Sequence, residues 1–240
     1  MTLVEMKNLV LRHGLLEAVR DFSLSIAEGE TVALVGANGA GKTTLLRALA
    51  GAHRPSSGIV RFDGADVTRV SAHRRVQMGI ALVPEGRRLF PALTVEENLL
   101  VAAQRKRPGR WTVETVIEAF PLLDRLRHRR AATLSGGEQQ ATAIGRALIT
   151  NPRLLLLDEV SLGLAPQAVD FVYESLATVI REGATIVLVE QDLNRAMSVA
   201  DRLACMLEGR LVLEGSSSEL TREQVTDAYF GLRGRRSVDV

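Results

Sequence analysis

The sequence is short of cysteine, of aromatic side chains and of long apolar runs. Cys205 is the single cysteine among 240 residues, so no disulfide can form within the chain. Its place in the apolar run 203–207 predicts a buried structural thiol. No apolar run approaches the length of about eighteen residues that a membrane-spanning helix needs. Residues 1–11 lack the continuous apolar core of a secretory signal, and we therefore expect a cytoplasmic chain that does not itself cross a membrane.

An excess of charge of one sign is also missing. Lys and Arg number 30 and Asp and Glu number 28, and the net charge of +2 is too weak to predict nucleic-acid binding. Aromatic residues make up 4% of the chain, and no platform for stacking bases is visible. Arg-rich stretches at 105–110 and 125–130 are typical of solvated helix faces, and their position favours lipid headgroups over RNA as an alternative contact. We expect no nucleic-acid partner.

Apolar residues, by contrast, make up 46% of the chain, enough for one large domain with a buried core. Their spacing predicts antiparallel strands first, and then short aliphatic strands of the kind buried on both faces of a parallel sheet. A final hairpin and helix precede a loose tail that starts at residue 233. The predicted strands lie at 3–11, 19–26, 31–35, 153–157, 184–189, 203–207 and 211–213. The predicted helices lie at 42–50, 94–104, 112–120, 138–150, 167–181 and 218–230.

A glycine-rich loop follows the third predicted strand. Residues 36–43 fit the pattern G-x-x-x-x-G-K-[ST], with the strand before and the helix after that the mechanism requires. In this arrangement backbone N–H groups and the helix N-terminus bind phosphate, Lys42 reaches the β- and γ-phosphates of ATP, and Thr43 ligates Mg²⁺. A plain glycine turn before a helix is the weaker alternative. The predicted nucleotide contacts are Gly36, Ala37, Asn38, Gly39, Ala40, Gly41, Lys42, Thr43 and Thr44.

Two carboxylates end the aliphatic strand at 153–157. Asp158 and Glu159 are thereby expected at the carboxyl edge of a parallel sheet, where ligands bind. Asp158 can hold Mg²⁺ through water, and Glu159 can orient or deprotonate the attacking water. A solvated strand end is the alternative for such a pair alone, and the phosphate loop in the same chain argues against it.

A third motif lies at 134–139, with the sequence Leu-Ser-Gly-Gly-Glu-Gln. A serine and two glycines at the start of a helix make a second anion site from hydroxyl and backbone N–H groups, although the same residues could be a simple helix cap. This segment resembles the signature sequence of ATP-binding cassette ATPases. The resemblance implies nucleotide contacts from Ser135, Gly136, Gly137 and Glu138.

The resemblance covers essentially the whole chain. It implies an α/β fold: a P-loop NTPase core with a mainly parallel sheet, N-terminal antiparallel strands and an inserted helical subdomain. Residues 1–240 would then form one ATPase domain, with a core at about 1–88 and 150–240 and a helical signature subdomain at about 89–149. In such ATPases two cassettes meet head to tail, and each ATP lies between the P-loop of one and the signature of the other.

Three departures from the commonest cassette pattern narrow the resemblance. Glu85 stands where most cassettes have a glutamine between the two subdomains, Gln191 replaces the histidine that usually contacts the γ-phosphate, and segment 161–166 has an alanine where most have an aspartate. Together they resemble one of the two ATPase subunits of branched-chain amino-acid importers. This implies ATP and Mg²⁺ as ligands, Glu85 as a metal contact in addition to Thr43 and Asp158, and Gln191 as a catalytic residue in addition to the glutamate.

The subfamily resemblance also implies partners. These are a second ABC ATPase subunit, two membrane-spanning permease subunits and, indirectly, an extracytoplasmic substrate-binding protein. The ATPase pair is expected to be a heterodimer, and a homodimer in isolation stays open as an alternative. The chain would sit peripherally on the cytoplasmic face of the cell membrane and couple MgATP hydrolysis to uptake of branched-chain or other hydrophobic amino acids.

Other functions stay open. A urea or amide importer would use the same ATPase role. A soluble cassette of translation or DNA repair usually has tandem cassettes or a long coiled coil, and neither is visible. The third alternative is a nucleotide-gated regulator with little ATP turnover. The intact Lys42, Asp158 and Glu159 argue against it, whereas Gln191 in place of the usual histidine keeps it open.

Two positions differ even from the subfamily pattern. Val160 stands where a proline normally follows the Asp-Glu pair, and we expect it to extend the strand. His13 occupies the place where an aromatic ring usually stacks on adenine. An imidazole can stack but offers less surface than tyrosine, and an exposed loop residue is an equal alternative.

Overall fold

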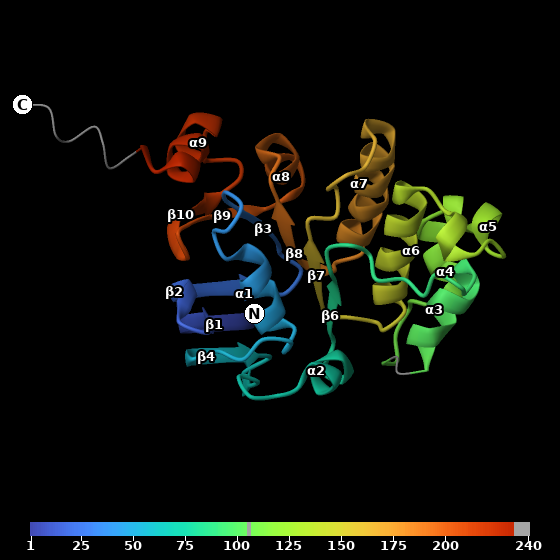
Figure 1. Ribbon diagram of the computed structural model, residues 1–240, viewed down its shortest axis with the longest axis horizontal. Helices are drawn as coiled ribbons and strands as arrows, with labels where there is room; N and C mark the ends of the chain where they lie inside the picture. Colours follow the sequence, from blue (N-terminus) through green and yellow to red (C-terminus); the bar gives the residue numbers. More distant parts are fainter. Residues whose placement is uncertain (105–106, 233–240) are drawn as a thin grey trace, which may run out of the picture. The chain divides into compact units, whose positions relative to one another are not determined.

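The computed structural model describes residues 1–104 and 107–232 (Figure 1). The predicted tail from residue 233 and the first two positions of the stretch at 105–110 lie outside the described residues. The chain divides into two compact units, residues 1–72 with 185–240 and residues 73–184. The predicted subdomain boundaries near 88 and 150 differ from this division and stay a prediction.

The N-terminal sheet of the first unit is antiparallel throughout, as predicted. Its order is β2-β1-β4-β5, and the strand pairs run antiparallel. Inward-facing apolar side chains of its first two strands are buried, while alternate positions are exposed. The strands are β1 (Thr2–His13), β2 (Leu16–Ala27), β4 (Ser57–Phe62) and β5 (Ala65–Asp66).

The first unit also contains a second, mixed set of strands in the order β10-β9-β3-β8. Strand β3 (Thr31–Val35) pairs in parallel with β8 (Thr185–Glu190) and β9 (Arg202–Leu207), and β9 forms the predicted hairpin with β10 (Arg210–Ser216). Every residue of β3 and β8 is buried, which is the expected result for strands of a covered parallel sheet.

Helices cover this sheet. Helix α1 (Lys42–Leu49) follows β3, and α8 (Leu193–Val199) and α9 (Arg222–Phe230) pack on β3 and β9 through a shared apolar cluster. Cys205 lies in that cluster with 1% of its surface exposed, so the predicted buried thiol is confirmed. Burial raises its pKa to about 11, against a smaller opposite effect from the charge of Lys42.

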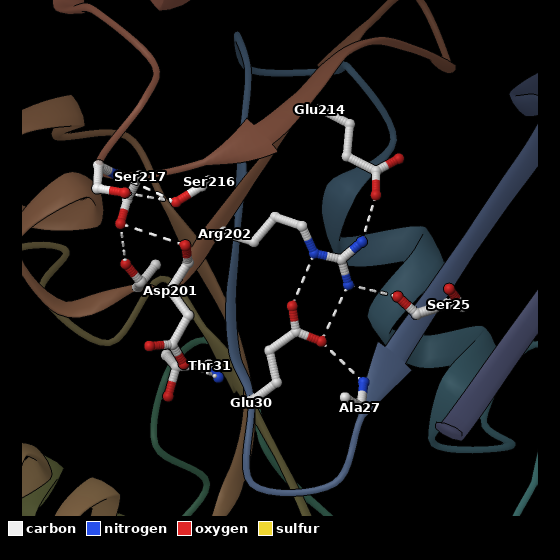
Figure 2. A network of polar contacts seen from close by, with 11 residues as sticks. Ser25, Ala27, Glu30, Thr31, Asp201, Arg202, Glu214, Ser216 and Ser217 are labelled. Carbon is white, nitrogen blue, oxygen red and sulfur yellow. Dashed lines mark hydrogen bonds and ion pairs between the residues drawn. The ribbon is translucent and has the colours of Figure 1, made fainter. Parts of the chain in front are cut away.

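A polar network closes the end of this sheet from which β3 starts (Figure 2). Arg202 donates from Nε and Nη2 to the carboxylate of Glu30 at 2.7 and 3.0 Å, and it also pairs with Glu214. The carboxylate of Asp201 accepts from the backbone N–H of Thr31 at 2.8 Å. Charge-assisted bonds of this kind anchor the strand that leads into the glycine loop.

The second unit combines a parallel strand pair with a group of helices. Strand β6 (Ile80–Val83) pairs in parallel with β7 (Leu154–Asp158), and α2 (Ala72–Met78) precedes β6. The helices that follow β6 are α3 (Val95–Ala103), α4 (Val113–Ala119), α5 (Leu122–Leu126), the 3₁₀ turn Ala131–Thr133, α6 (Gly136–Leu148) and α7 (Pro166–Arg181).

Helix α6 is the centre of this helical group. A Cβ on its Gly145 would lie 2.8 Å from the Val116 side chain and 3.2 Å from the Leu99 side chain, so a larger residue there would force the side chains of α4 and α3 to shift. Thr94 and Thr112 begin α3 and α4 with capping boxes. The inserted helices were predicted from their periodicity and are confirmed. Among the described residues, no helix combines the length and apolar character that spanning a bilayer requires.

Several elements escaped the sequence analysis. The unpredicted elements are β4, β5, β6, α2, α5 and α8. Each is short or interrupted by polar residues, so its periodicity is weak. The expectation for Val160 was wrong: β7 ends at Asp158, and Glu159 turns the chain with φ 49°. Val160 does not extend the strand, and its side chain is 1% exposed in the core after the turn.

Candidate nucleotide site

The glycine loop lies between β3 and α1 in the first unit. Its glycines Gly36, Gly39 and Gly41 have φ of 151°, 84° and 100°, which L side chains rarely adopt. A Cβ on Gly36 would lie 2.2 Å from the carbonyl oxygen of Met206, and one on Gly41 would lie 2.3 Å from that of Ala18. Glycine is therefore required at both positions, because a Cβ atom at either one would collide with a neighbouring backbone oxygen.

Lys42, the first residue of α1, is the charge at the centre of this loop. Only 4% of its surface is exposed, and its ammonium donates to the carbonyl oxygens of Gly36 at 2.6 Å and Ala37 at 3.0 Å. Within the described part of the chain, no side chain makes a capping hydrogen bond at Gly41, the N-cap of α1. A buried cation held over a helix N-terminus makes an anion site, so this loop fits a phosphate chain.

The two predicted carboxylates lie in the second unit at the end of β7. All five residues of β7 are buried, and Asp158 is 2% exposed while Glu159 is half-buried. The positive φ of Glu159 costs conformational free energy that the surrounding structure must offset. Such strain in a non-glycine residue is common at functional sites.

The signature segment begins α6 in the same unit. Ser135 is the N-cap of α6, its hydroxyl accepts from the N–H of Glu138 at 3.4 Å, and its own N–H donates to the Glu138 carboxylate at 2.6 Å. The helix-cap alternative is thus realised in the fold, and Glu138 has a capping contact. A Cβ on Gly137 would lie 2.6 Å from that of Ala168, so close packing against α7 also requires this glycine.

Glu85 lies in an exposed turn after β6, and the residues that follow it have unusual backbone geometry. Gly86, Arg87 and Arg88 all have positive φ. The guanidinium of Arg87 donates to the Gln139 side chain at 3.2 Å, so this turn is tied to the signature helix. Sequence reasoning missed Arg87, because only the fold brings it to α6.

His13 and Gln191 belong to the first unit. His13, at the end of β1, is exposed, and its Nε2 lies 3.1 Å from the Thr44 hydroxyl. Its ring centroid lies 4.7 Å from that of His53, a residue that sequence reasoning did not single out. Gln191 follows β8, is half-buried, and its N–H donates to the Glu190 carboxylate at 3.2 Å.

The candidate residues therefore divide between the units. The first unit holds the phosphate loop with His13, Thr44 and Gln191, and the second holds Glu85, the signature segment and the two carboxylates. Each motif has the local structure that its proposed chemistry needs. The roles of individual residues stay predictions.

Comparison with known proteins agrees with the motifs. A family model described as ABC transporter matches residues 19–161. The chain is 44% identical over 222 residues to a high-affinity branched-chain amino acid transport ATP-binding protein, BraG of Pseudomonas aeruginosa, covering 91% of this chain and 95% of that one. It is 31% identical to BraF, of the same description and organism, covering 95% and 98%.

A solved structure supports the fold. A dimeric ATP-binding cassette in a post-hydrolysis state, bound to ADP and phosphate, superposes with a TM-score of 0.79 at 27% identity, covering 89% of this chain and 98% of that one. The chain belongs to the ABC transporter family, and its P-loop NTPase fold is confirmed. It is an ATP-binding subunit that hydrolyses ATP, and ABC ATPases work with other ATPase and permease subunits in transporter complexes.

Proposed function

We propose that this chain powers uptake of branched-chain or other hydrophobic amino acids by hydrolysing MgATP on the cytoplasmic face of the membrane. The observation that carries the proposal is the 44% identity to BraG over nearly the whole of both chains. The buried Lys42 in a loop that only glycine can form supplies the chemistry. Nothing favours a urea importer or a soluble non-transport cassette.

The phosphate end of the nucleotide is assigned to the glycine loop. Backbone N–H groups from Gly36 to Thr44 and the Lys42 ammonium bind the phosphate oxygens. When ATP binds, the Lys42 ammonium would exchange its hydrogen bonds to the carbonyl oxygens of Gly36 and Ala37 for bonds to phosphate oxygens. The buried ammonium would then have a charged partner. His13 is the residue we assign to the adenine ring.

The metal contacts are assigned to oxygen donors. Thr43, Asp158 and Glu85 offer a hydroxyl and two carboxylates, the donor type that Mg²⁺ prefers. The described residues contain no group of three His, Cys, Asp or Glu side chains that could hold a metal. Mg²⁺ typically binds to one or two carboxylates together with phosphates and water. When bound, Mg²⁺ neutralises charge on the phosphates.

Glu159 is assigned as general base and Gln191 as a γ-phosphate contact. Glu159 directly follows the buried strand β7, at the carboxyl end where ligands of a parallel sheet bind, and its backbone has a positive φ. The carboxylate orients the attacking water and accepts its proton. The amide of Gln191 donates a hydrogen bond to the γ-phosphate where most cassettes use histidine.

The signature segment is assigned to the nucleotide of a second ATPase subunit. Ser135 is exposed at the N-terminus of a 13-residue helix, and its N–H groups and hydroxyl suit an incoming phosphate. BraG and BraF occur as two different ATP-binding proteins in one organism, and both resemble this chain. We therefore propose a head-to-tail heterodimer, with a homodimer as the form in isolation.

A groove in the second unit is the proposed contact with the permease subunits. It has a volume of about 370 Å³, and its lining includes Arg88, Phe90, Val101 and Arg146. Phe90 is 48% exposed, and the Cζ atom of Arg146 lies over its ring, 5.8 Å from the ring centroid. An exposed aromatic ring in an apolar groove suits a short cytoplasmic segment of a permease. An extracytoplasmic binding protein would supply the amino acid.

The Glu159→Gln variant tests this proposal. The amide cannot accept a proton, so ATP turnover should fall by about 100-fold or more while the ATP dissociation constant stays within about threefold. Steady-state phosphate release and equilibrium titration with ATP measure the two quantities.

Glu174→Gln, on the exposed face of α7, is the matched control and should turn over ATP like the wild type. Lys42→Ala should lose nucleotide binding. Turnover by Glu159→Gln near the wild-type rate would remove the glutamate from its assigned role. For the cargo, ATPase activity of the chain reconstituted with its permeases should rise with leucine and its binding protein, and not with urea.

A further inference from the structure

The contacts of His13 differ from those of a free loop side chain. Its imidazole is held from two sides: Nε2 lies 3.1 Å from the Thr44 hydroxyl, and the ring packs on His53 with centroids 4.7 Å apart and planes tilted by 49°. Thr44 is in the first turn of α1, next to the residues assigned to phosphate. His13 is therefore linked to the helix that starts at the phosphate site.

His53 is built into the turn that follows α1. Its N–H donates to the carbonyl oxygen of Arg47 at 3.1 Å, and the side chain is half-buried. Its Nε2 is buried and has no hydrogen-bond partner among the described residues. Packing and a backbone hydrogen bond at Arg12 therefore hold this ring, and its Nε2 makes no hydrogen bond among the described residues.

The charge state of His53 suits this packing. Burial is the largest cause that lowers the pKa of His53 below 6.5, and electrostatic repulsion from His13 and Arg47 lowers it further. A backbone hydrogen bond at Arg12 has a smaller effect in the opposite direction. The His53 imidazole is consequently neutral near pH 7. A neutral His53 ring can pack against the His13 ring without charge repulsion.

We propose that His53 is a positioning residue for the nucleobase: it packs against His13 and, together with Thr44, holds the His13 ring where it can stack on adenine. The inference rests on the proposed function, in which His13 meets the adenine ring. It goes beyond that function because it gives a role to a second imidazole, that of His53, which is not itself assigned a contact with the nucleotide.

The physical reason is preorganisation. A single imidazole offers little stacking area, and a mobile exposed side chain loses rotamer freedom when it stacks. A ring that is already held in place avoids this loss on binding. The advantage applies to ligands with a base and not to the phosphate chain, which Lys42 and the glycine loop bind.

The experiment compares ATP with inorganic tripolyphosphate, which has the same number of phosphates and no base. Both are titrated into the purified chain, the Lys42→Ala variant and variants of His53. His53→Ala should weaken ATP binding by about threefold to tenfold and change tripolyphosphate binding by less than about twofold. His53→Phe keeps a ring against His13 and should bind ATP within about twofold of wild type.

Two further variants separate positioning from general damage. In a His13→Ala background, His53→Ala should cause no additional loss of ATP affinity, because its effect acts through the His13 ring. The matched control is His73→Ala, an exposed histidine on α2, which should bind both ligands like the wild type. Retained tripolyphosphate binding shows that the His53→Ala chain is folded at the site.

The outcomes are distinct. An unchanged ATP affinity in His53→Ala, or an equal loss of affinity for ATP and tripolyphosphate, overturns the positioning role. So does a further loss in the His13→Ala background. None of these results contradicts the proposed function, in which the chain binds ATP. ATP binding that survives Lys42→Ala instead contradicts the proposed function itself.

Discussion

The glycine loop allows a quantitative test, because two of its glycines are constrained in different ways. Gly39 and Gly41 both have positive φ, 84° and 100°. A Cβ on Gly39 meets nothing within 4 Å, whereas one on Gly41 would lie 2.3 Å from the backbone oxygen of Ala18. Alanine at Gly39 therefore adds only backbone strain, and alanine at Gly41 adds strain and a collision.

The magnitudes follow from these distances. Backbone strain at a non-glycine residue with positive φ costs about 1–2 kcal/mol. At Gly41 the backbone must also move by about 1 Å to restore an ordinary contact, and forced overpacking of this kind costs about 1–3 kcal/mol more. Gly39→Ala should thus lower the free energy of unfolding by about 1–2 kcal/mol, and Gly41→Ala by about 2–5 kcal/mol.

Urea denaturation and thermal melting of the purified chain measure the difference. For a chain of this size the two variants should differ in Tm by about 2–12 °C, with Gly41→Ala the lower. Equal stability of the two variants would show that the approach of Ala18 to the loop does not constrain Gly41. A more stable Gly41→Ala variant would refute the geometry of the loop altogether.

Two further predictions concern the signature segment and pH. Replacing the exposed Ser135 by Arg should leave the ATP affinity of the isolated subunit within about twofold of wild type. The same change should abolish most substrate-stimulated ATPase activity in the reconstituted transporter, because this segment is assigned to the partner's nucleotide. Full activity of the assembled variant would contradict that assignment. A bulky residue at Gly137 is a poorer test, since it also collides with Ala168. Because the native pKa of His53 is lowered, the unfolded chain binds more protons than the native one as pH falls through 6.5, so acid should reduce the free energy of unfolding. His53→Phe should flatten this part of the curve in urea titrations from pH 7.5 to 5.5, and a slope identical to wild type would refute the contribution.

Much of the fold follows from local patterns. The strand, glycine loop and helix at Thr31–Leu49 have periodicity and composition that leave few alternatives, and the same holds for the aliphatic strand β7. The short strand β4 and helix α8 were missed because polar residues and glycine break their patterns. The extension of β7 by Val160 was predicted from its β propensity, and the turn at Glu159 overrides that preference.

The candidate site shows the same division. The chemistry of Lys42 and of the carboxylate pair is readable from the sequence, because the spacing of a phosphate loop and of a strand end is local. The sequence could not decide between an anion site and a helix cap at Ser135, and the capping box with Glu138 shows that the cap exists in the fold. Neither cap nor glycine packing excludes the proposed phosphate contact.

What the sequence by itself determined is therefore the class of chemistry: a phosphate loop, a strand-end carboxylate pair and a signature segment, each contained in a few consecutive residues. What only the tertiary structure decided is which residues support them. Ala18 constrains Gly41, Arg87 reaches the signature helix and His53 packs on His13, although these partners are 23, 52 and 40 positions apart in the sequence. Such contacts depend on how β1, β2 and the helices pack around the core, and a local pattern contains no information about residues that approach only after the chain has folded.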